Sequence, residues 1–510
     1  MSAPPQGQYQ YTQGSYPPPP PQYDNNAYYN NMQPPATSQG YYANNMQQAE
    51  QQPYQSNHNP MKEHETNQGG FSNWKDLWAL GLWILNLAAF IGVSVLALQS
   101  FKTNQKTTSG GVQSANPYGG MTFDTSTFKI FGLAGVVGFA LSLLYLILVN
   151  LIPTLMIYIT FILSIIIYFG VTIYYFTQHY YSAAIVFLIF SVLYLFCFFW
   201  WRSRIPFASV MLESVTSIMK RHPSTIVIGF ITLVIETAFT IWFLITVVGT
   251  YQRFYSTSSN NSSLNLAMVF LVFSFYWTSQ VISYVCYVTL SGIYASVYFN
   301  STNHPTMGSL KRALTYSFGS ICFGSLLIAL IEFIRYLIAV ARSSNDNPVC
   351  GFFLCIADCI VGCFQGLFEW FNNYAFSGVA IYGKGYVESA KRTWTLIKDR
   401  GVEALINDNL INNVLALGGI LVAVLSSLLG YIYLTISKPA FNQTGQMTPV
   451  VVLICFLIGL AMFNAIATVI TSGVCTTFVC LAEDPQALQR TQPALFEKIR
   501  QTWPNVVQGI

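Results

Sequence analysis

The chain has 510 residues, of which 53% are hydrophobic and 8% are charged, and its formal net charge is +4. Ordinary soluble domains carry about 25% charged residues, so this composition excludes an ordinary soluble domain and predicts the lipid bilayer as a partner. A net charge this small and this dispersed gives no reason to expect nucleic acid as a partner.

Residues 1–70 differ in composition from the rest of the chain, since Pro, Gln, Asn, Tyr and Gly dominate them. Asp24 and Glu50 are the only charged residues in the first 61 positions. Such a segment cannot bury enough apolar surface to offset its conformational entropy, so we expect a disordered cytosolic tail. The tail either binds a partner protein through its Pro and Tyr residues or is a solvated extension. It contains no apolar stretch of the kind that forms a cleavable signal peptide.

Ten apolar segments of spanning length follow the tail. A helix crosses a bilayer in about 20 residues, and backbone polar groups in lipid must be satisfied within each segment. We therefore expect an all-α polytopic membrane protein with a transmembrane domain over 74–482 and a cytosolic C-terminal tail over 483–510. Small residues such as Gly132, Gly135 and Gly138 predict close contacts between helices. The segments are Leu77–Leu98, Phe128–Val149, Ile152–Phe176, Ser182–Trp201, Thr225–Gly249, Leu266–Leu290, Ala313–Val340, Gly351–Tyr374, Ile411–Ile436 and Pro449–Thr471.

The loop charges predict the orientation of these helices. Lys and Arg favour the cytosolic side of a membrane protein. With the N-terminus in the cytosol, sixteen Lys and Arg residues lie on the cytosolic side, six lie on the outer side, and Arg335 lies within a segment. We therefore expect both termini in the cytosol.

Four glycosylation sequons bear on the same orientation. Asn260, Asn261 and Asn442 begin sequons in predicted outer loops, so these three residues are candidates for modification. Asn300 begins a sequon in a predicted inner loop and is expected to remain unmodified.

Two predicted inner connections show the spacing of amphipathic helices. The longer one joins the eighth and ninth segments, and charges occupy much of its remaining surface. This pattern predicts a helix at the membrane surface or against the bundle. The connection between the fourth and fifth segments has a weaker form of the same pattern. The apolar residues of the longer connection are Val387, Ala390, Trp394 and Ile397.

No motif for catalysis or metal binding is evident in the sequence. There is no Walker loop, zinc-protease motif or nucleophile elbow, and the five histidines do not form a convergent set. Cys355, Cys359 and Cys363 recur every four residues without a C-x-x-C pair, which favours packing over zinc binding. We therefore expect no enzyme active site, no metal and no cofactor.

Ionisable residues inside the apolar segments are the strongest candidates for function. Each would cost about 2.5–3.5 kcal/mol at mid-bilayer if it faced lipid, so we expect these side chains to face the bundle interior. Glu236 lies in the fifth segment, Glu332 and Arg335 in the seventh, and Asp358 in the eighth. Glu332 and Arg335 form either part of a polar pathway or a neutralising intrahelical pair. Glu236 either stays protonated in a dry environment or binds a cation or a proton in transit.

An aromatic face on the sixth segment is a second candidate. Trp277, Tyr284 and Tyr287 share this face with Gln280 and Ser291. Aromatic faces can hold a quaternary ammonium by cation–π attraction, so a cationic amine is one candidate solute. Core packing with interfacial tyrosines also accounts for the pattern.

Four short segments resemble a known family. They are WRSRIP from Trp201 to Pro206, LKRALTYSFGSICFGSLL from Leu310 to Leu327, NNYAFSGVAIYGK from Asn372 to Lys384, and LINDNL from Leu405 to Leu410. Together they are similar to the choline transporter-like family, and the Pro- and Tyr-rich tail resembles its fungal branch, the pH-nine-sensitive proteins. The resemblance implies ten spans with both termini in the cytosol. It also implies membrane transport, with choline as the substrate of some animal members.

These observations predict a multi-pass protein of the cell membrane that transports a small-molecule solute by alternating access. A non-transporting membrane scaffold, and a channel or lipid-moving protein, are the alternatives. The candidate pathway residues are Glu236, Glu332, Arg335 and Asp358, with Trp277, Tyr284 and Tyr287 as an aromatic wall.

Overall fold

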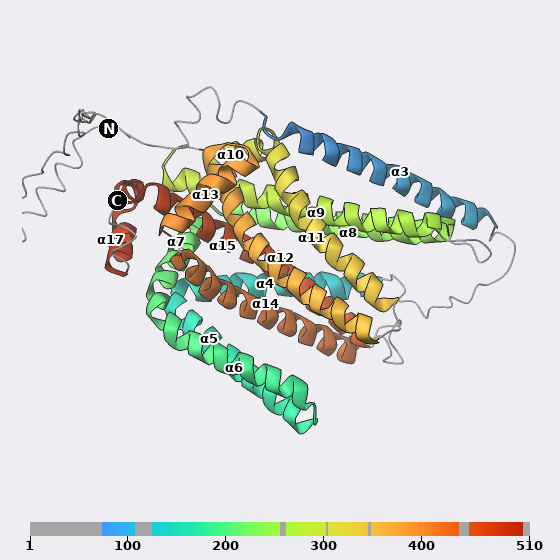
Figure 1. The fold of residues 1–510 in the computed structure, drawn as a ribbon, viewed down its shortest axis with the longest axis horizontal. Helices are drawn as coiled ribbons and strands as arrows, with labels where there is room; N and C mark the ends of the chain where they lie inside the picture. The colour runs from blue at the N-terminus through green and yellow to red at the C-terminus, as the bar shows by residue number, and fades with distance from the viewer. Residues whose placement is uncertain are drawn as a thin grey trace, which may run out of the picture. The chain divides into compact units, whose positions relative to one another are not determined.

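Long helices dominate the computed structural model (Figure 1). The structure describes residues 74–107, 125–254, 262–301, 304–344, 348–400, 402–437 and 448–502. Every regular element within these ranges is a helix. The predicted disordered tail over 1–70 lies outside them, as do the sequon residues Asn260, Asn261 and Asn442.

Ten of the helices are long and apolar enough to span a membrane, which confirms the predicted number and the all-α polytopic fold. Each predicted segment corresponds to one of them. They are α3 (Leu77–Thr107), α4 (Thr125–Leu151), α5 (Pro153–Thr177), α6 (Tyr181–Trp201), α8 (Ser224–Phe254), α9 (Ser262–Tyr298), α11 (Phe318–Ser343), α12 (Pro348–Tyr382), α14 (Val402–Ser437) and α15 (Thr448–Glu483).

Shorter helices lie in connections, and after the last spanning helix, in regions that the loop charges place in the cytosol. Two of them, α7 and α13, are the helices that amphipathic spacing predicts. Pro153 and Pro305 lie in the first turns of α5 and α10, where the missing N–H of proline is not needed. The short helices are η2 (Arg202–Arg204), α7 (Ile205–Arg221), α10 (Pro305–Leu314), α13 (Tyr386–Arg400), α16 (Pro485–Thr491) and α17 (Pro493–Thr502).

The predicted start of the seventh segment at Ala313 is wrong. Ala313 belongs to α10, and the spanning helix α11 begins only at Phe318. Thr315 leaves the helical conformation, with φ −120° and ψ −94°. The carbonyl of Tyr316 then accepts a hydrogen bond from the Lys75 N–H at 3.2 Å. The break between α10 and α11 is therefore stabilised by a tertiary contact with a residue some 240 positions earlier. Local hydropathy does not predict such a contact.

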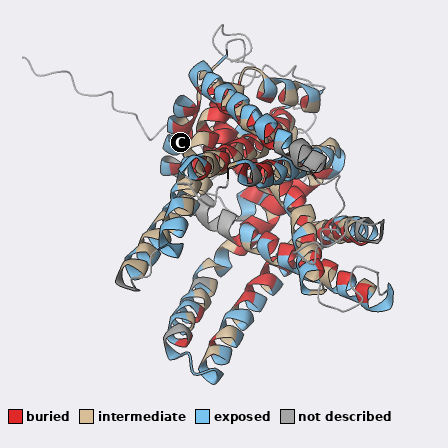
Figure 2. Ribbon diagram, turned by 90° about the vertical axis from the view of Figure 1, so that its right-hand side faces the viewer, coloured by how far each residue is buried: buried red, intermediate tan, exposed pale blue. Residues whose placement is uncertain are grey.

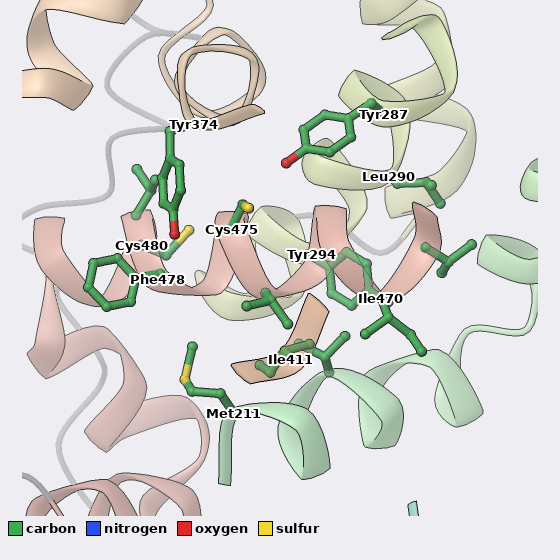
Figure 3. Packing of buried hydrophobic residues seen from close by; sticks show 14 of the residues in the cluster. Met211, Tyr287, Leu290, Tyr294, Tyr374, Ile411, Ile470, Cys475, Phe478 and Cys480 are labelled. Atoms are coloured by element: carbon green, nitrogen blue, oxygen red, sulfur yellow. The ribbon is translucent and has the colours of Figure 1, made fainter. Parts of the chain in front are cut away.

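Helices α9 and α15 form the centre of the packed core (Figure 3). Tyr287, Leu290 and Tyr294 of α9 lie near Ile470 and other buried residues of α15. Gly473 of α15 permits this contact, because an added Cβ would lie 2.6 Å from Val215 Cγ1 on α7 and 2.7 Å from Tyr294 Cζ. The amphipathic helix α7 therefore packs against the bundle rather than lying apart from it.

In α9, α11, α12 and α15, burial is concentrated in the half that is predicted to be cytosolic. In α12 no residue from Cys350 to Trp370 is buried, whereas nearly every residue from Asn372 to Tyr382 is buried. The buried residues of α11 all lie between Gly319 and Ala329, in its first half. Figure 2 shows the buried segments gathered where the helices converge, with the tips of several helices largely exposed. The opposite halves thus present apolar side chains that suit contact with lipid.

The three glycines of α4 provide a graded test of helix packing. An added Cβ at Gly138 would lie 3.2 Å from Gly459 Cα and 3.4 Å from Ser426 Oγ, whereas one at Gly132 would meet nothing within 4 Å. We expect Gly138→Leu to destabilise the protein by about 1–3 kcal/mol through overpacking, and Gly132→Leu to have little effect. Thermal unfolding of the full chain in detergent, followed by size-exclusion chromatography, measures both. Equal losses in the two variants would contradict the contact between α4, α14 and α15.

Candidate functional site

A cavity of about 470 Å³ lies between α8, α9, α12 and α15. Polar side chains reach it from all four helices, although each helix is apolar overall. We call it the Glu236 cavity. Its polar and aromatic lining residues are Thr232, Glu236, Gln280, Ser283, Tyr284, Tyr287, Asn373, Asn464, Thr468 and Thr471.

Helical periodicity explains how these residues come together. On α9, Gln280, Ser283, Tyr284 and Tyr287 follow each other at intervals of three, one and three residues, which places them on one face. The lining residues of α8 and of α15 repeat at the same kind of spacing. Helices α8, α9 and α15 therefore each turn one face towards the cavity, and α12 adds Asn373.

Glu236 is the acidic side chain of the cavity. It is the one carboxylate among the described lining residues, which include no Lys or Arg. Its side chain is half-buried, and Ser283 of α9 lines the same cavity. A lone carboxylate among neutral polar groups favours a cation.

Close packing on one side of the cavity holds α8 beside α15. An added Cβ at Gly229 would lie 2.9 Å from the carbonyl oxygen of Ala465 and 3.2 Å from Val469 Cγ2. Gly229 precedes Glu236 by two helical turns, so it fixes the approach of α8 to α15 on the predicted cytosolic side of the carboxylate.

Gln280 connects the cavity with a second carboxylate. Its Nε2 donates a hydrogen bond to Glu332 Oε1 on α11 at 2.8 Å, while its side chain also lines the cavity. Glu236 and Glu332 thus lie on two different helices. Gln280 lines the cavity that contains Glu236 and donates a hydrogen bond to Glu332. Glu332 itself is not among the residues that line the cavity.

Arg335 forms its ion pair with a residue of another helix, so of the two alternatives the intrahelical pair with Glu332 is not the one seen. Instead its Nε donates to Asp358 Oδ1 on α12 at 2.9 Å, and its Nη1 donates to Gln365 Oε1 at 2.9 Å. Gln365 Nε2 in turn donates to Glu369 Oε1 at 2.6 Å. Arg335 of α11 therefore forms a network with Asp358, Gln365 and Glu369 of α12.

The aromatic face of α9 is divided between two environments. Tyr284 and Tyr287 line the Glu236 cavity. Trp277 lies outside its lining, where its Nε1 donates to the carbonyl of Cys322 at 3.1 Å and its ring packs in a cluster with Ala79. The structure thus brings two of the three predicted wall residues together at the cavity.

A layer of aromatic rings lies next to the cavity. The Tyr284 ring is 4.4 Å from the Phe376 ring, which is 5.5 Å from Tyr386, and Tyr386 is 5.3 Å from Phe323. Gly324 makes room for them, since an added Cβ would lie 2.5 Å from both Phe376 and Tyr386. We call Tyr284, Phe323, Phe376 and Tyr386 the inner aromatic layer.

Hydrogen bonds fix the position of Tyr386 in this layer. Burial raises the pKa of its hydroxyl above the ordinary value, and the neutral hydroxyl donates to Asn372 Oδ1 at 2.6 Å. Its backbone N–H donates to Asp76 Oδ2 at 2.9 Å, and the Ser320 hydroxyl donates to the same oxygen at 2.6 Å. Asp76 therefore connects the start of α13 with α11 at the N-terminal end of α3.

A buried carboxylate holds α13 against α15. Glu483, whose side chain is 7% exposed, accepts hydrogen bonds from Arg392 and, at 2.8 Å, from the Tyr382 hydroxyl. The Arg392 guanidinium also lies 4.2 Å from the centre of the Tyr382 ring. Burial disfavours the charge of Arg392, yet Glu483 beside it keeps the pKa of the guanidinium above its ordinary value. We call Tyr382, Arg392 and Glu483 the inner clamp.

Breaking the inner clamp is expected to destabilise the protein measurably. Glu483→Gln leaves the charge of Arg392 without its partner, and removal of one member of a fully buried pair costs about 3–5 kcal/mol. Because the Arg392 side chain is 35% exposed, we expect a smaller loss of about 2 kcal/mol. Thermal unfolding of the full chain in detergent measures it. The exposed pair of Lys384 with Glu388 is the matched control, and Glu388→Gln should change stability by less than about 0.5 kcal/mol.

Sequence reasoning missed the neutral polar members of the cavity. Asn373, Asn464, Thr468 and Thr232 were not among the candidates, although Asn464, Thr468 and Thr471 recur at helical spacing in an apolar segment. That spacing is the signal that could have marked α15 as a lining helix.

Comparison with known proteins covers the whole of this region. A family model described as plasma-membrane choline transporter matches residues 185–486, a range that includes every lining residue of the cavity. Protein PNS1 of Gibberella zeae is 39% identical over 452 residues, which cover 86% of this chain and 84% of the relative. Protein PNS1 of Debaryomyces hansenii is 37% identical over 460 residues, and that of Candida albicans is 37% identical over 466 residues; each alignment covers 86% of this chain and 88% of the relative. With ten spanning helices in the same chain, these matches show that this multi-pass membrane protein belongs to the choline transporter-like family, alongside the fungal PNS1 proteins.

Proposed function

We propose that this protein transports a small cationic solute across the plasma membrane and binds it in the Glu236 cavity. The observation that carries the proposal is a cavity lined by residues of four spanning helices, with one carboxylate, two tyrosines and no described basic residue. Glu236 lies twelve residues after the first residue of α8, which corresponds to about 18 Å along the helix. This depth lies near the middle of a bilayer whose hydrocarbon core is about 30 Å thick.

The size and chemistry of the cavity suit a compact organic cation. Its volume of about 470 Å³ falls within the range of small-molecule sites, roughly 300–1,000 Å³. We propose that the rings of Tyr284 and Tyr287 attract the cation by cation–π interaction and that the Glu236 carboxylate attracts it by charge. Choline, which appears in the description of the matching family model, is the first solute to test.

The inner side of the cavity supports an alternating-access mechanism. The inner aromatic layer and the inner clamp join the predicted cytosolic ends of α11, α12, α13 and α15. We infer a conformation that is closed towards the cytosol, from which release requires α12 and α13 to move away from α15.

Glu332 and Gln280 form a second polar position beside the cavity. Because the Gln280 amide donates to Glu332 and Gln280 also lines the cavity, a change at Glu332 reaches the cavity lining through a single side chain. We propose that Glu332 tunes the cavity through Gln280. Arg335 and Asp358 compensate each other's charge between α11 and α12.

Uptake into vesicles tests the proposed function. The purified full chain is reconstituted, and uptake of labelled choline and ethanolamine is measured with and without a pH gradient. Saturable uptake that exceeds that of protein-free vesicles is expected for at least choline. If neither solute were taken up under any gradient, the proposal that this protein transports a cationic amine would be excluded.

A further inference from the structure

A second concave site lies between α12 and α13. It has a volume of about 830 Å³ and shares no lining residue with the Glu236 cavity. Most of its wall is apolar and aromatic, and Phe364, Leu367 and Trp394 are each more than half exposed. We call it the α12–α13 groove. Its lining residues are Phe364, Leu367, Phe368, Trp370, Phe371, Tyr386, Val387, Ala390, Lys391, Trp394, Ile397 and Lys398.

Two lysines border this apolar wall. Lys391, Trp394 and Lys398 lie three and four residues apart, so they share one face of α13. Both lysines are exposed, and neither forms an ion pair with a described residue. By contrast, Arg392 on another side of α13 is held by Glu483. The groove therefore combines apolar surface with two available positive charges.

The position of α13 places these charges at the depth of lipid head groups. The helix follows the end of α12 on the side where the loop charges predict the cytosol, and it packs beside α12 (Figure 1). The Trp394 ring lies edge-on to the Phe371 ring at 5.7 Å. Tryptophan favours the membrane–water interface, and lysines there extend towards the head groups.

We propose that the α12–α13 groove binds an anionic glycerophospholipid of the cytosolic leaflet. An acyl chain lies along Phe364, Leu367 and Phe368 of α12, and the phosphate group lies between Lys391 and Lys398. The apolar wall belongs to a spanning helix, so lipid rather than a soluble partner reaches it. The two lysines select an anionic head group, because each basic residue near the surface adds about 1 kcal/mol of attraction to anionic lipid.

Lipid titration of the full chain tests this site. The protein purified in detergent is titrated with dioleoyl phosphatidylserine and, separately, with dioleoyl phosphatidylcholine, and bound lipids are counted by native mass spectrometry. We expect tighter binding of phosphatidylserine and a loss of about 25-fold in its affinity in the double variant Lys391→Gln/Lys398→Gln, or about fivefold per lysine. Trp394→Ala should weaken the binding of both lipids.

Two control variants separate charge from folding. The double variant Lys391→Arg/Lys398→Arg keeps the charge and should bind phosphatidylserine as the unchanged protein does. Lys311→Gln removes another exposed lysine, on α10, and should have no effect. Unchanged phosphatidylserine affinity in Lys391→Gln/Lys398→Gln would overturn the proposal, as would equal affinity for both lipids in the unchanged protein. Complete displacement of phosphatidylserine by glycerophosphoserine, which has no acyl chain, would also overturn the proposal. The apolar wall of the groove would then contribute nothing to the affinity for the lipid.

Discussion

Replacing Glu236 with glutamine is expected to lower choline uptake at least about tenfold while the protein still folds. The substitution removes the one carboxylate among the described lining residues of the cavity but keeps the size and hydrogen-bonding capacity of the side chain. A tenfold loss corresponds to about 1.4 kcal/mol of attraction for the cation, which is modest for a charge in a partly dry site. Initial rates of uptake into vesicles, normalised to the amount of folded protein, measure the effect.

Matched variants identify the source of that loss. Glu236→Asp keeps the charge and should retain more uptake than Glu236→Gln. Thr237→Val changes the next residue of α8, which is exposed and does not line the cavity, and should leave uptake unchanged. If Glu236→Gln left both uptake and its pH dependence unchanged, the role of Glu236 in the pathway would be lost. A scaffold, in contrast, would tolerate Glu236→Gln and lose its function when residues 1–70 are deleted.

The ten spans could be predicted because the bilayer imposes a strict rule on the backbone. A segment in lipid must satisfy its own N–H and C=O groups, so length and apolarity identify each helix directly. The start of α11 could not be found in this way. Thr315 and Tyr316 are compatible with a helix, and the break between α10 and α11 is occupied by contacts of Tyr316 and Ser320 with Lys75 and Asp76. Such contacts depend on which helices are neighbours, and hydropathy does not contain that information.

The candidate site could be predicted in part, for a related reason. A carboxylate such as Glu236 is costly in lipid, so its presence alone marks it. Neutral residues leave a weaker signal, because a threonine can bond to its own helix, as Thr468 does to the carbonyl of Asn464 at 2.9 Å. The partner of Arg335 could not be identified, because the sequence does not say which helices are neighbours. Glu332 is nearest in sequence, but the partner, Asp358, lies on the adjacent helix α12.

Exchanging the charges of Arg335 and Asp358 should distinguish a structural pair from a solute contact. Arg335→Gln or Asp358→Asn alone leaves one charge of α11 or α12 uncompensated. Loss of one partner of a buried pair costs about 3–5 kcal/mol. The side chains are 41% and 28% exposed, so we expect a smaller loss of about 1–3 kcal/mol. The double variant Arg335→Asp/Asp358→Arg restores opposite charges and should recover most of this stability, as measured by thermal unfolding in detergent.

Uptake by the same variants decides what the pair does. Neither Arg335 nor Asp358 lines the Glu236 cavity, so we expect the exchanged pair to recover choline uptake together with stability. Gln365 is the internal control, because Arg335 also donates to it, and Gln365→Ala should lower stability less than Arg335→Gln does. Recovery of stability without recovery of uptake would contradict the structural role and place one of the two charges in direct contact with the solute. The polar pathway would then extend from the Glu236 cavity to the network between α11 and α12.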